Sequence, residues 1–159
     1  MRKNVKTLKK NFDNAIMLEW RNVLQIEMLI LYELADYTPQ GLSEFADSFY
    51  SYLEDAIRHT KELDAMLEDF KKATGLHLDE VKLEGTAVTK AIKTTDALCI
   101  QIGAFILWYV GEWESREIRK FAYTCWDFLG DYSTIAPRIR IMERMTGIKV
   151  ENRFKRLAH

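Results

Sequence analysis

Glu27 is a single carboxyl group in the middle of an apolar helical face. Residues three, four and seven positions away from it lie on the same side of a helix. In both directions these neighbours are apolar: Leu24, Ile30, Val23, Leu31, Trp20 and Leu34. A buried carboxylate destabilises a fold unless it is paired, hydrogen-bonded or protonated. Glu27 is therefore either the centre of a binding pocket or dimer interface, or a structural group that fixes helix register.

The expected partners of Glu27 come from the second predicted helix. Folding the first two helices back about Tyr37 brings Glu27 opposite Ser48, with Tyr52 close by. Their hydroxyl groups could donate to the carboxylate. The cations that could pair with Glu27 from other helices are Lys93, Arg116 and Arg138. The sequence thus predicts a buried polar cluster around Glu27.

Histidine and cysteine patterns give little support to catalysis. None of the three histidines follows a glutamate by three residues, so the Glu-x-x-His pairs of carboxylate-bridged di-metal bundles are absent. Asp55 and His59, four residues apart, predict a hydrogen-bonded pair on one helix flank, and we count His59 among the candidate polar residues. The chain has no GxSxG, GxGxxG or GxxxxGK[ST] motif. We expect no metal and no cofactor, and the sequence leans against an enzyme without excluding one.

Trp113 is an aromatic residue in a predicted turn. It lies in the segment 110–115, between two predicted helices. A tryptophan on a turn is a typical anchor for a protein partner. It could equally fold back against the next helix as a hydrophobic staple. Trp113 is therefore a candidate partner contact.

Charge is segregated along the chain. Residues 1–12 carry five cationic side chains and no acid, residues 13–86 carry 6 basic and 16 acidic side chains, and residues 132–159 carry 7 and 2. The basic ends are expected to lie on the acidic helices, within one molecule or across a dimer. The alternative is contact with nucleic-acid phosphates. The residues for that contact are Lys3, Lys6, Lys10, Arg138, Arg140, Arg144, Lys149, Arg153 and Arg156.

Apolar periodicity and capping signals place these residues on helices. Helices are predicted over about residues 3–36, 38–73, 86–111, 115–129 and 133–146, with residues 148–159 forming either a sixth helix or a flexible basic tail. The second helix carries a sustained heptad-like seam, and the third is apolar nearly all round from Ala97 onward. We predict one all-α domain spanning residues 1–159. It is a bundle of five to six helices with a long antiparallel helix pair and a central apolar helix.

Composition favours a soluble protein of the cytoplasm. Cys99 and Cys125 lie in apolar helical stretches without a CxxC pattern, which favours buried, reduced thiols. The most apolar run, Ala97–Val110, is shorter than the roughly 20 residues that cross a bilayer. The basic first residues are not followed by the apolar region of a secretory signal. We expect no membrane contact.

The leading functional hypothesis is a non-enzymatic helical interaction protein. It would be a small regulator, inhibitor or adaptor that acts by protein–protein contact. The long seam and the apolar third helix exceed what one helix pair needs, so a homodimer or another bound protein is expected. The first alternative is a nucleic-acid-binding accessory protein that uses the basic ends. The second is a small-molecule pocket or enzyme centred on Glu27.

Overall fold

The computed structural model describes residues 2–150, with side chains described from Val5 onward. This part of the chain forms six α-helices and no strand. They are α1 (Arg2–Leu34), α2 (Pro39–Ile57), α3 (Lys61–Thr74), α4 (Ala87–Tyr109), α5 (Ser115–Gly130) and α6 (Tyr132–Thr146). The predicted all-α bundle is confirmed, with six helices.

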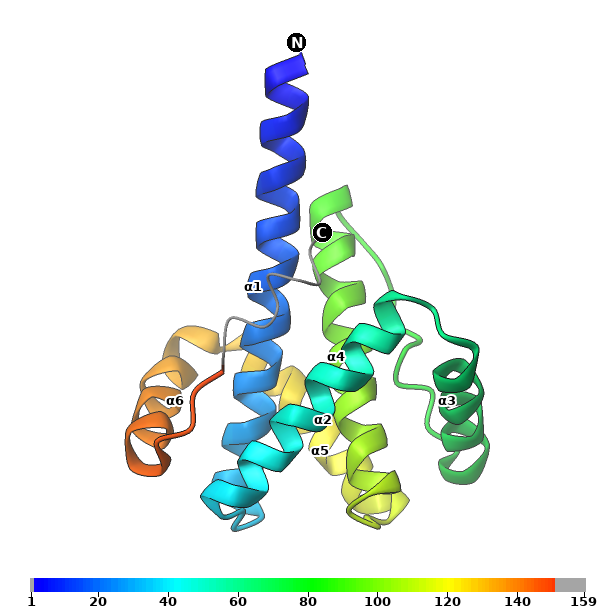
Figure 1. Ribbon diagram of the computed structural model, residues 1–159, viewed down its shortest axis with the longest axis vertical. Coiled ribbons are helices and arrows are strands. Elements are labelled where there is room, and N and C mark those ends of the chain that lie inside the picture. Colours follow the sequence, from blue (N-terminus) through cyan, green and yellow to red (C-terminus); the bar gives the residue numbers. More distant parts are fainter. Residues whose placement is uncertain (1, 151–159) are drawn as a thin grey trace.

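Four of the six described helices surround a central pair. Helices α1 and α4 run side by side in the same direction, and α1 packs most extensively against α4. Helix α2 crosses in front of this pair and α5 lies behind it, while α6 and α3 flank α1 and α4 respectively (Figure 1). Helices α1 and α2 run in opposite directions about the turn at residues 35–38, as predicted. The main partner of α1, however, is α4.

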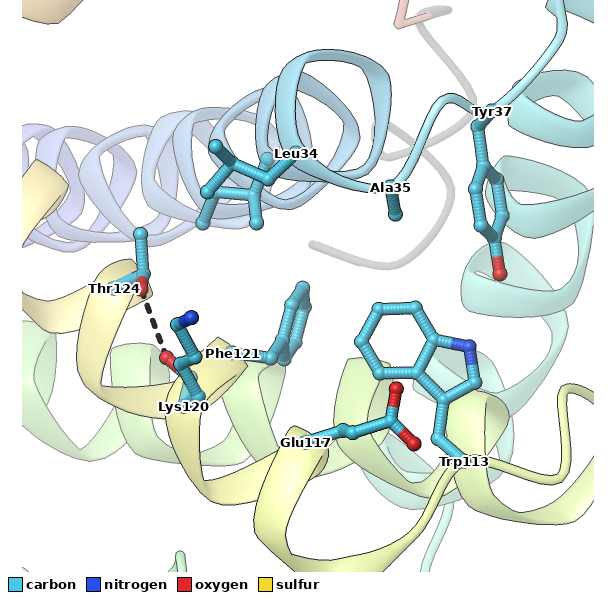
Figure 2. A pocket seen from close by; sticks show the side chains of 9 residues that line it. Leu34, Ala35, Tyr37, Trp113, Glu117, Lys120, Phe121 and Thr124 are labelled. Carbon is cyan, nitrogen blue, oxygen red and sulfur yellow. Dashed lines mark hydrogen bonds between the residues drawn. The ribbon is translucent and has the colours of Figure 1, made fainter.

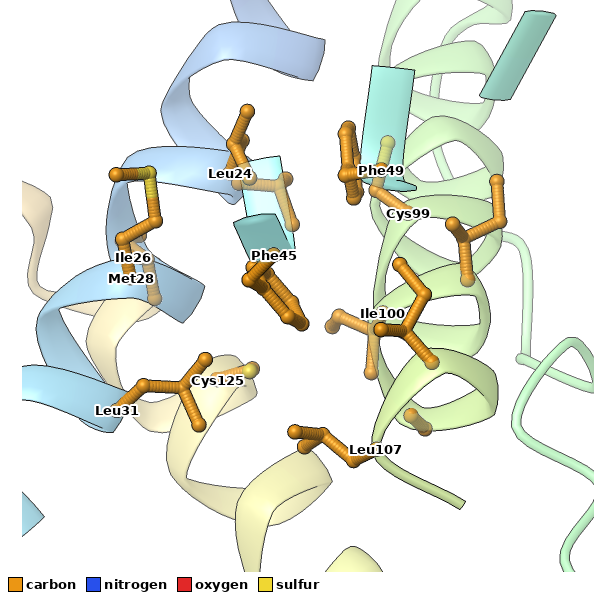
Figure 3. Packing of buried hydrophobic residues seen from close by; sticks show 14 of the residues in the cluster. Leu24, Ile26, Met28, Leu31, Phe45, Phe49, Cys99, Ile100, Leu107 and Cys125 are labelled. Atoms are coloured by element: carbon orange, nitrogen blue, oxygen red, sulfur yellow. The ribbon is translucent and has the colours of Figure 1, made fainter. Parts of the chain in front are cut away.

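The core lies between α1 and α4 and the helices that cover them. Residues 23–31 of α1 are all buried, and so is nearly every residue from Thr95 to Leu107 of α4. A helix covered on several sides must be apolar on several sides, which explains why the third predicted helix has no polar face. Side chains of α1, α2, α4 and α5 meet in this core (Figure 3). The apolar surface of α4 is therefore covered within one chain, and it no longer argues for a homodimer.

Helix α4 meets a membrane-span test only by length and composition. It has 23 residues, but 67% of its most apolar window is buried against the rest of the molecule. A mostly buried apolar helix is what the centre of a soluble bundle requires. Among residues 2–150, α4 is the one helix that meets this test.

The predicted second helix is two helices. Helix α2 ends at Ile57, His59 has a φ of 54°, and α3 begins at Lys61 in another direction. Thr60 caps α3, because its hydroxyl oxygen accepts a hydrogen bond from the backbone N–H of Leu63. The heptad-like spacing continues across this break only because both helices bury an apolar stripe, so the prediction of one helix to Ala73 was wrong.

Other helix ends follow the sequence signals closely. Thr38 caps α2 with Pro39 as its first residue, and Gly75 and Gly147 end α3 and α6 with φ values of 70° and 73°. Helix α5 is capped by Glu114, one residue before the predicted cap.

Two expectations near the C-terminus need correction. Helix α6 begins at Tyr132, one residue before the predicted start, and Pro137 lies inside it. Ile148 packs against the core and Val150 is 9% exposed, so residues 148–150 are held against the bundle. The remainder of the predicted tail, 151–159, lies outside the described residues.

Candidate functional site

Glu27 is buried in the core, as its apolar face predicted. Its side chain is 0% exposed and lies against Gly103 of α4. A Cβ atom at position 103 would lie 1.7 Å from Oε1 of Glu27, so the carboxyl group fills the space that the missing side chain leaves. Helix α1 can therefore approach α4 closely here only because residue 103 is glycine.

The predicted partners of Glu27 do not reach it. Within residues 5–150, neither carboxylate oxygen of Glu27 has a hydrogen-bond partner, so the expected bonds from Ser48 and Tyr52 were wrong. The register argument failed because α4, and not α2, covers the face that carries Glu27. Of the candidate cations, Arg138 forms an ion pair with Glu33 and lies 5.0 Å from the ring centre of Phe128.

The environment of Glu27 favours its uncharged form. Burial raises the pKa of the Glu27 carboxyl well above its ordinary value. A low-dielectric site penalises the ionised form. Burial thus favours the protonated form of Glu27, whose two carboxyl oxygen atoms have no hydrogen-bond partner among the described residues.

A second acidic pair lies at the α1–α4 contact. Glu19 and Asp96 share a carboxyl–carboxylate hydrogen bond. Burial, the charge of Glu19 and this hydrogen bond together raise the pKa of Asp96 to about 8. Burial also raises the pKa of Glu19. The sequence analysis missed this pair, although Glu19 lies eight residues before Glu27 and Asp96 opens the apolar stretch of α4.

Both cysteines are buried free thiols, as expected. Burial raises the thiol pKa of Cys99 and of Cys125 well above the ordinary value. A thiol with a raised pKa is a poor nucleophile and a poor metal ligand. These cysteines therefore act as small core residues.

The other polar candidates, Ser48, Tyr52 and His59, lie in three different surroundings. Ser48 is half-buried and lines a small cavity of about 130 Å³ between α2 and the end of α4. The Tyr52 ring meets Phe105 edge-on, with 5.2 Å between ring centres. His59 is exposed in the α2–α3 connection, so the predicted helical pair with Asp55 does not form. The polar cluster predicted around Glu27 is therefore absent from the described residues.

Trp113 forms one wall of a groove at the end of the bundle where α1 ends. The groove has a volume of about 570 Å³ (Figure 2). Leu34 and Ala35 form the opposite wall, and Tyr37 closes one end. The Trp113 ring meets Phe121 edge-on at 6.3 Å between ring centres. The residues that line the groove are Ile30, Leu34, Ala35, Tyr37, Trp113, Glu117, Lys120, Phe121 and Thr124.

The groove is apolar inside and mainly acidic at its edge. Leu34 is 65% exposed there. Five exposed acids line the groove or are adjacent in sequence to its lining residues: Glu33, which pairs with Arg138, Asp36, Glu112, Glu114 and Glu117. Three exposed bases meet the same criterion: Arg116, Arg119 and Lys120. Trp113 is half-buried, so it stacks into the wall and presents only part of its ring.

The N-terminal turns of α1 extend beyond the bundle (Figure 1). We call residues 5–12, all of which are exposed, the N-terminal arm. Val5, Leu8 and Phe12 are 66%, 68% and 38% exposed and lie on one face at helical spacing. The arm therefore carries an apolar stripe that no described part of the chain covers.

Lysines run beside this stripe. Lys6, Lys9 and Lys10 are exposed, and residues 5–12 contain no acid. The stripe continues into the bundle, because Ile16 is the next residue on this face and packs against the core. The periodicity at residues 5–16 is thus the core-facing pattern of α1 prolonged past its covering helices.

The nucleic-acid candidates do not form one surface. Lys6 and Lys10 lie on the arm, whereas Arg138, Arg140 and Arg144 lie on α6, which is well separated from the arm (Figure 1). Arg138 is occupied by Glu33. Lys149 follows α6, the Lys3 side chain is not described, and Arg153 and Arg156 lie outside the described residues.

Among residues 5–150 no cluster of three or more histidine, cysteine or acidic side chains is arranged to hold a metal ion. The features that stand out are therefore the arm at one end of α1, the groove at the other, and the buried acids between them. Comparisons of the chain with protein-family models, curated proteins and solved structures gave no match.

Proposed function

We propose that this protein is a non-enzymatic helical interaction protein that binds another protein through its N-terminal arm. The supporting observation is the exposed stripe of Val5, Leu8 and Phe12 on a helix that extends past its bundle. Amphipathic helices that bind a groove use anchors at this i, i+3, i+7 spacing. The protein would act as a regulator, inhibitor or adaptor by occupying a surface of its partner.

Energetics favour a bound state for the arm. A short helix without tertiary contacts is marginally stable in water, because its hydrogen bonds barely offset the loss of chain entropy. Burying an exposed Leu or Phe side chain contributes roughly 1.5–3 kcal/mol. A partner that covers Leu8 and Phe12 would therefore stabilise both the helix and the complex.

The proposed location is the cytoplasm. Two free, buried cysteines suit a reducing compartment, since no disulfide is needed to hold this core.

The test uses a photo-crosslinking amino acid in place of Leu8. A protein captured through this position is identified, purified and titrated against the unmodified chain. We expect Leu8→Gln with Phe12→Gln to weaken binding about tenfold or more, because two apolar anchors are lost. The matched control is Ile141→Gln with Met145→Gln on α6, whose side chains are 53% and 69% exposed. Equal affinity of the arm variant and the control would contradict the proposal.

The nucleic-acid alternative retains one supporting feature. Lys6, Lys9 and Lys10 are exposed together on the arm. A phosphate-driven interaction weakens steeply with salt. Anisotropy titrations with labelled single- and double-stranded nucleic acid at low and high salt decide the matter, and we expect no binding at either.

A further inference from the structure

We propose that the groove beside Trp113 receives the N-terminal arm of a second copy of this chain, so that two copies exchange arms reciprocally. This inference rests on the proposed function, since it assigns a receptor to the same arm. It joins two surfaces that the described residues leave exposed: the stripe of Val5, Leu8 and Phe12, and the apolar groove at the far end of α1.

The arm cannot reach the groove of its own chain. Leu8 and Leu34 both belong to the continuous helix α1. They are separated by about 39 Å along the helix, at about 1.5 Å per residue. Contact between the basic first residues and the groove must therefore be made between molecules.

Shape supports the match. The groove volume of about 570 Å³ lies within the range of sites that bury apolar ligands of moderate size. Its walls are Leu34, Phe121 and Trp113, and a helix that laid Leu8 and Phe12 into it would cover the exposed leucine as well. Aromatic walls of this kind are typical of the sites where interface anchors bind.

The distribution of charge favours binding of the arm in the groove over packing of two arms against each other. The arm carries Lys6, Lys9 and Lys10 without an acid. The edge of the groove carries five exposed acids, Glu33, Asp36, Glu112, Glu114 and Glu117, against the three bases Arg116, Arg119 and Lys120. Two arms packed together would instead bring lysines against lysines. Complementary charges favour the docked pair, whereas like charges oppose the alternative.

Geometry favours a closed pair of copies. The arm and the groove lie at opposite ends of the bundle, so an antiparallel pair places each arm beside the groove of the other copy. In a two-fold pair both arm–groove contacts form at once, and neither copy keeps an unoccupied arm or groove. The second junction forms within the complex and adds to the affinity of the first.

Sedimentation equilibrium of the full chain and two variants tests the inference. The arm variant is Leu8→Gln with Phe12→Gln. The groove variant is Leu34→Lys, which adds a cation opposite the lysines at a position that is 65% exposed, so that the fold is retained. We expect the unmodified chain to be a dimer and each variant alone to be a monomer, with dissociation constants raised about tenfold or more. Ile141→Gln with Met145→Gln, the control, should dimerise like the unmodified chain.

Mixing the two variants gives the sharpest result. The groove variant has an intact arm and the arm variant an intact groove, so a mixture is expected to form a mixed dimer through one junction. Circular dichroism of each variant checks that the helices are intact. A groove variant that dimerises like the unmodified chain, or a mixture that stays monomeric, would overturn the inference.

Two further outcomes separate this inference from the proposed function. If the unmodified chain is monomeric but binds a different protein through Leu8 and Phe12, the inference fails and the proposed function stands. If the chain is monomeric and instead cosediments with phosphatidylserine vesicles in an arm-dependent way, both fail, because the arm would then be a membrane-surface helix.

Discussion

Gly103 and Glu27 form one unit at the residue scale. The carboxyl group occupies the space where any other residue at position 103 would place its Cβ atom. The burial of Glu27 was predictable, because apolar residues surround it on its helix face. Its partner was not, since helix periodicity identifies a buried face without showing which helix covers it.

Replacing Glu27 by Met should stabilise the fold. Methionine has a similar length and no polar atoms, so the cost of two buried oxygens without partners is removed. We expect the free energy of unfolding at pH 7 to rise by roughly 1–3 kcal/mol. Chemical denaturation measures it. A clear loss of stability would show that the carboxyl group has a bound partner, as the alternative of a pocket centred on Glu27 requires.

Replacing Gly103 by Ala should destabilise the fold by about 1–3 kcal/mol, because the new Cβ overlaps the Glu27 carboxyl group. The loss should be much smaller in a chain that also carries Glu27→Ala, which vacates the space. Denaturation of the two single variants and the double variant gives the coupling energy. Additive losses would mean that the two residues are not in contact.

The Glu19–Asp96 pair should make stability depend on pH. The pKa of Asp96 is raised from 3.8 to about 8, so the folded state binds more protons than the unfolded state between these values. Stability from this group is therefore complete at low pH and is lost as pH rises toward 8. Melting temperatures between pH 5 and 9 should fall less for Asp96→Asn than for the unmodified chain. Asp69→Asn, at an exposed acid on α3, is the control and should follow the unmodified curve.

Sequence patterns located most elements and missed how they connect. Helices α2, α4 and α5 begin directly after Thr38, Thr86 and the turn at residues 110–114. These starts were predictable because helix capping depends on local sequence. The break between α2 and α3 was missed, since Leu63, Leu67 and Phe70 continue the apolar spacing on a helix that points elsewhere.

The arm was hidden in the sequence for a related reason. Val5, Leu8 and Phe12 repeat the same spacing as the core residues that follow them. Only the three-dimensional arrangement shows that the covering helices stop short of these residues.

Deleting residues 2–12 should leave the bundle intact. No described residue of the arm is buried, so we expect the unfolding free energy of the diluted monomer to change by less than about 0.5 kcal/mol. Trp20→Ala, at a side chain 6% exposed, should by contrast cost roughly 3–5 kcal/mol. Urea denaturation compares the two variants. A large loss on deletion would mean that the arm packs on its own bundle.

At the scale of the whole molecule, α1 carries an exposed apolar stripe at one end and a groove wall at the other. The bundle between them keeps both surfaces at a fixed separation. Helix α4 is covered by other helices of the same chain, whereas the arm is exposed. A test of association should therefore mutate the arm and not α4. Substitutions inside the core would test stability, whereas those on the arm and the groove test binding.

Hydrogen exchange measured at two protein concentrations shows whether association covers the arm. In dilute solution the amides of residues 5–12 should exchange rapidly, because all eight residues are exposed at the end of a helix. At high concentration we expect slower exchange at residues 5–12 and, in parallel, around the groove at residues 30–37 and 111–121. Exchange of the arm that is equally fast at both concentrations would contradict it.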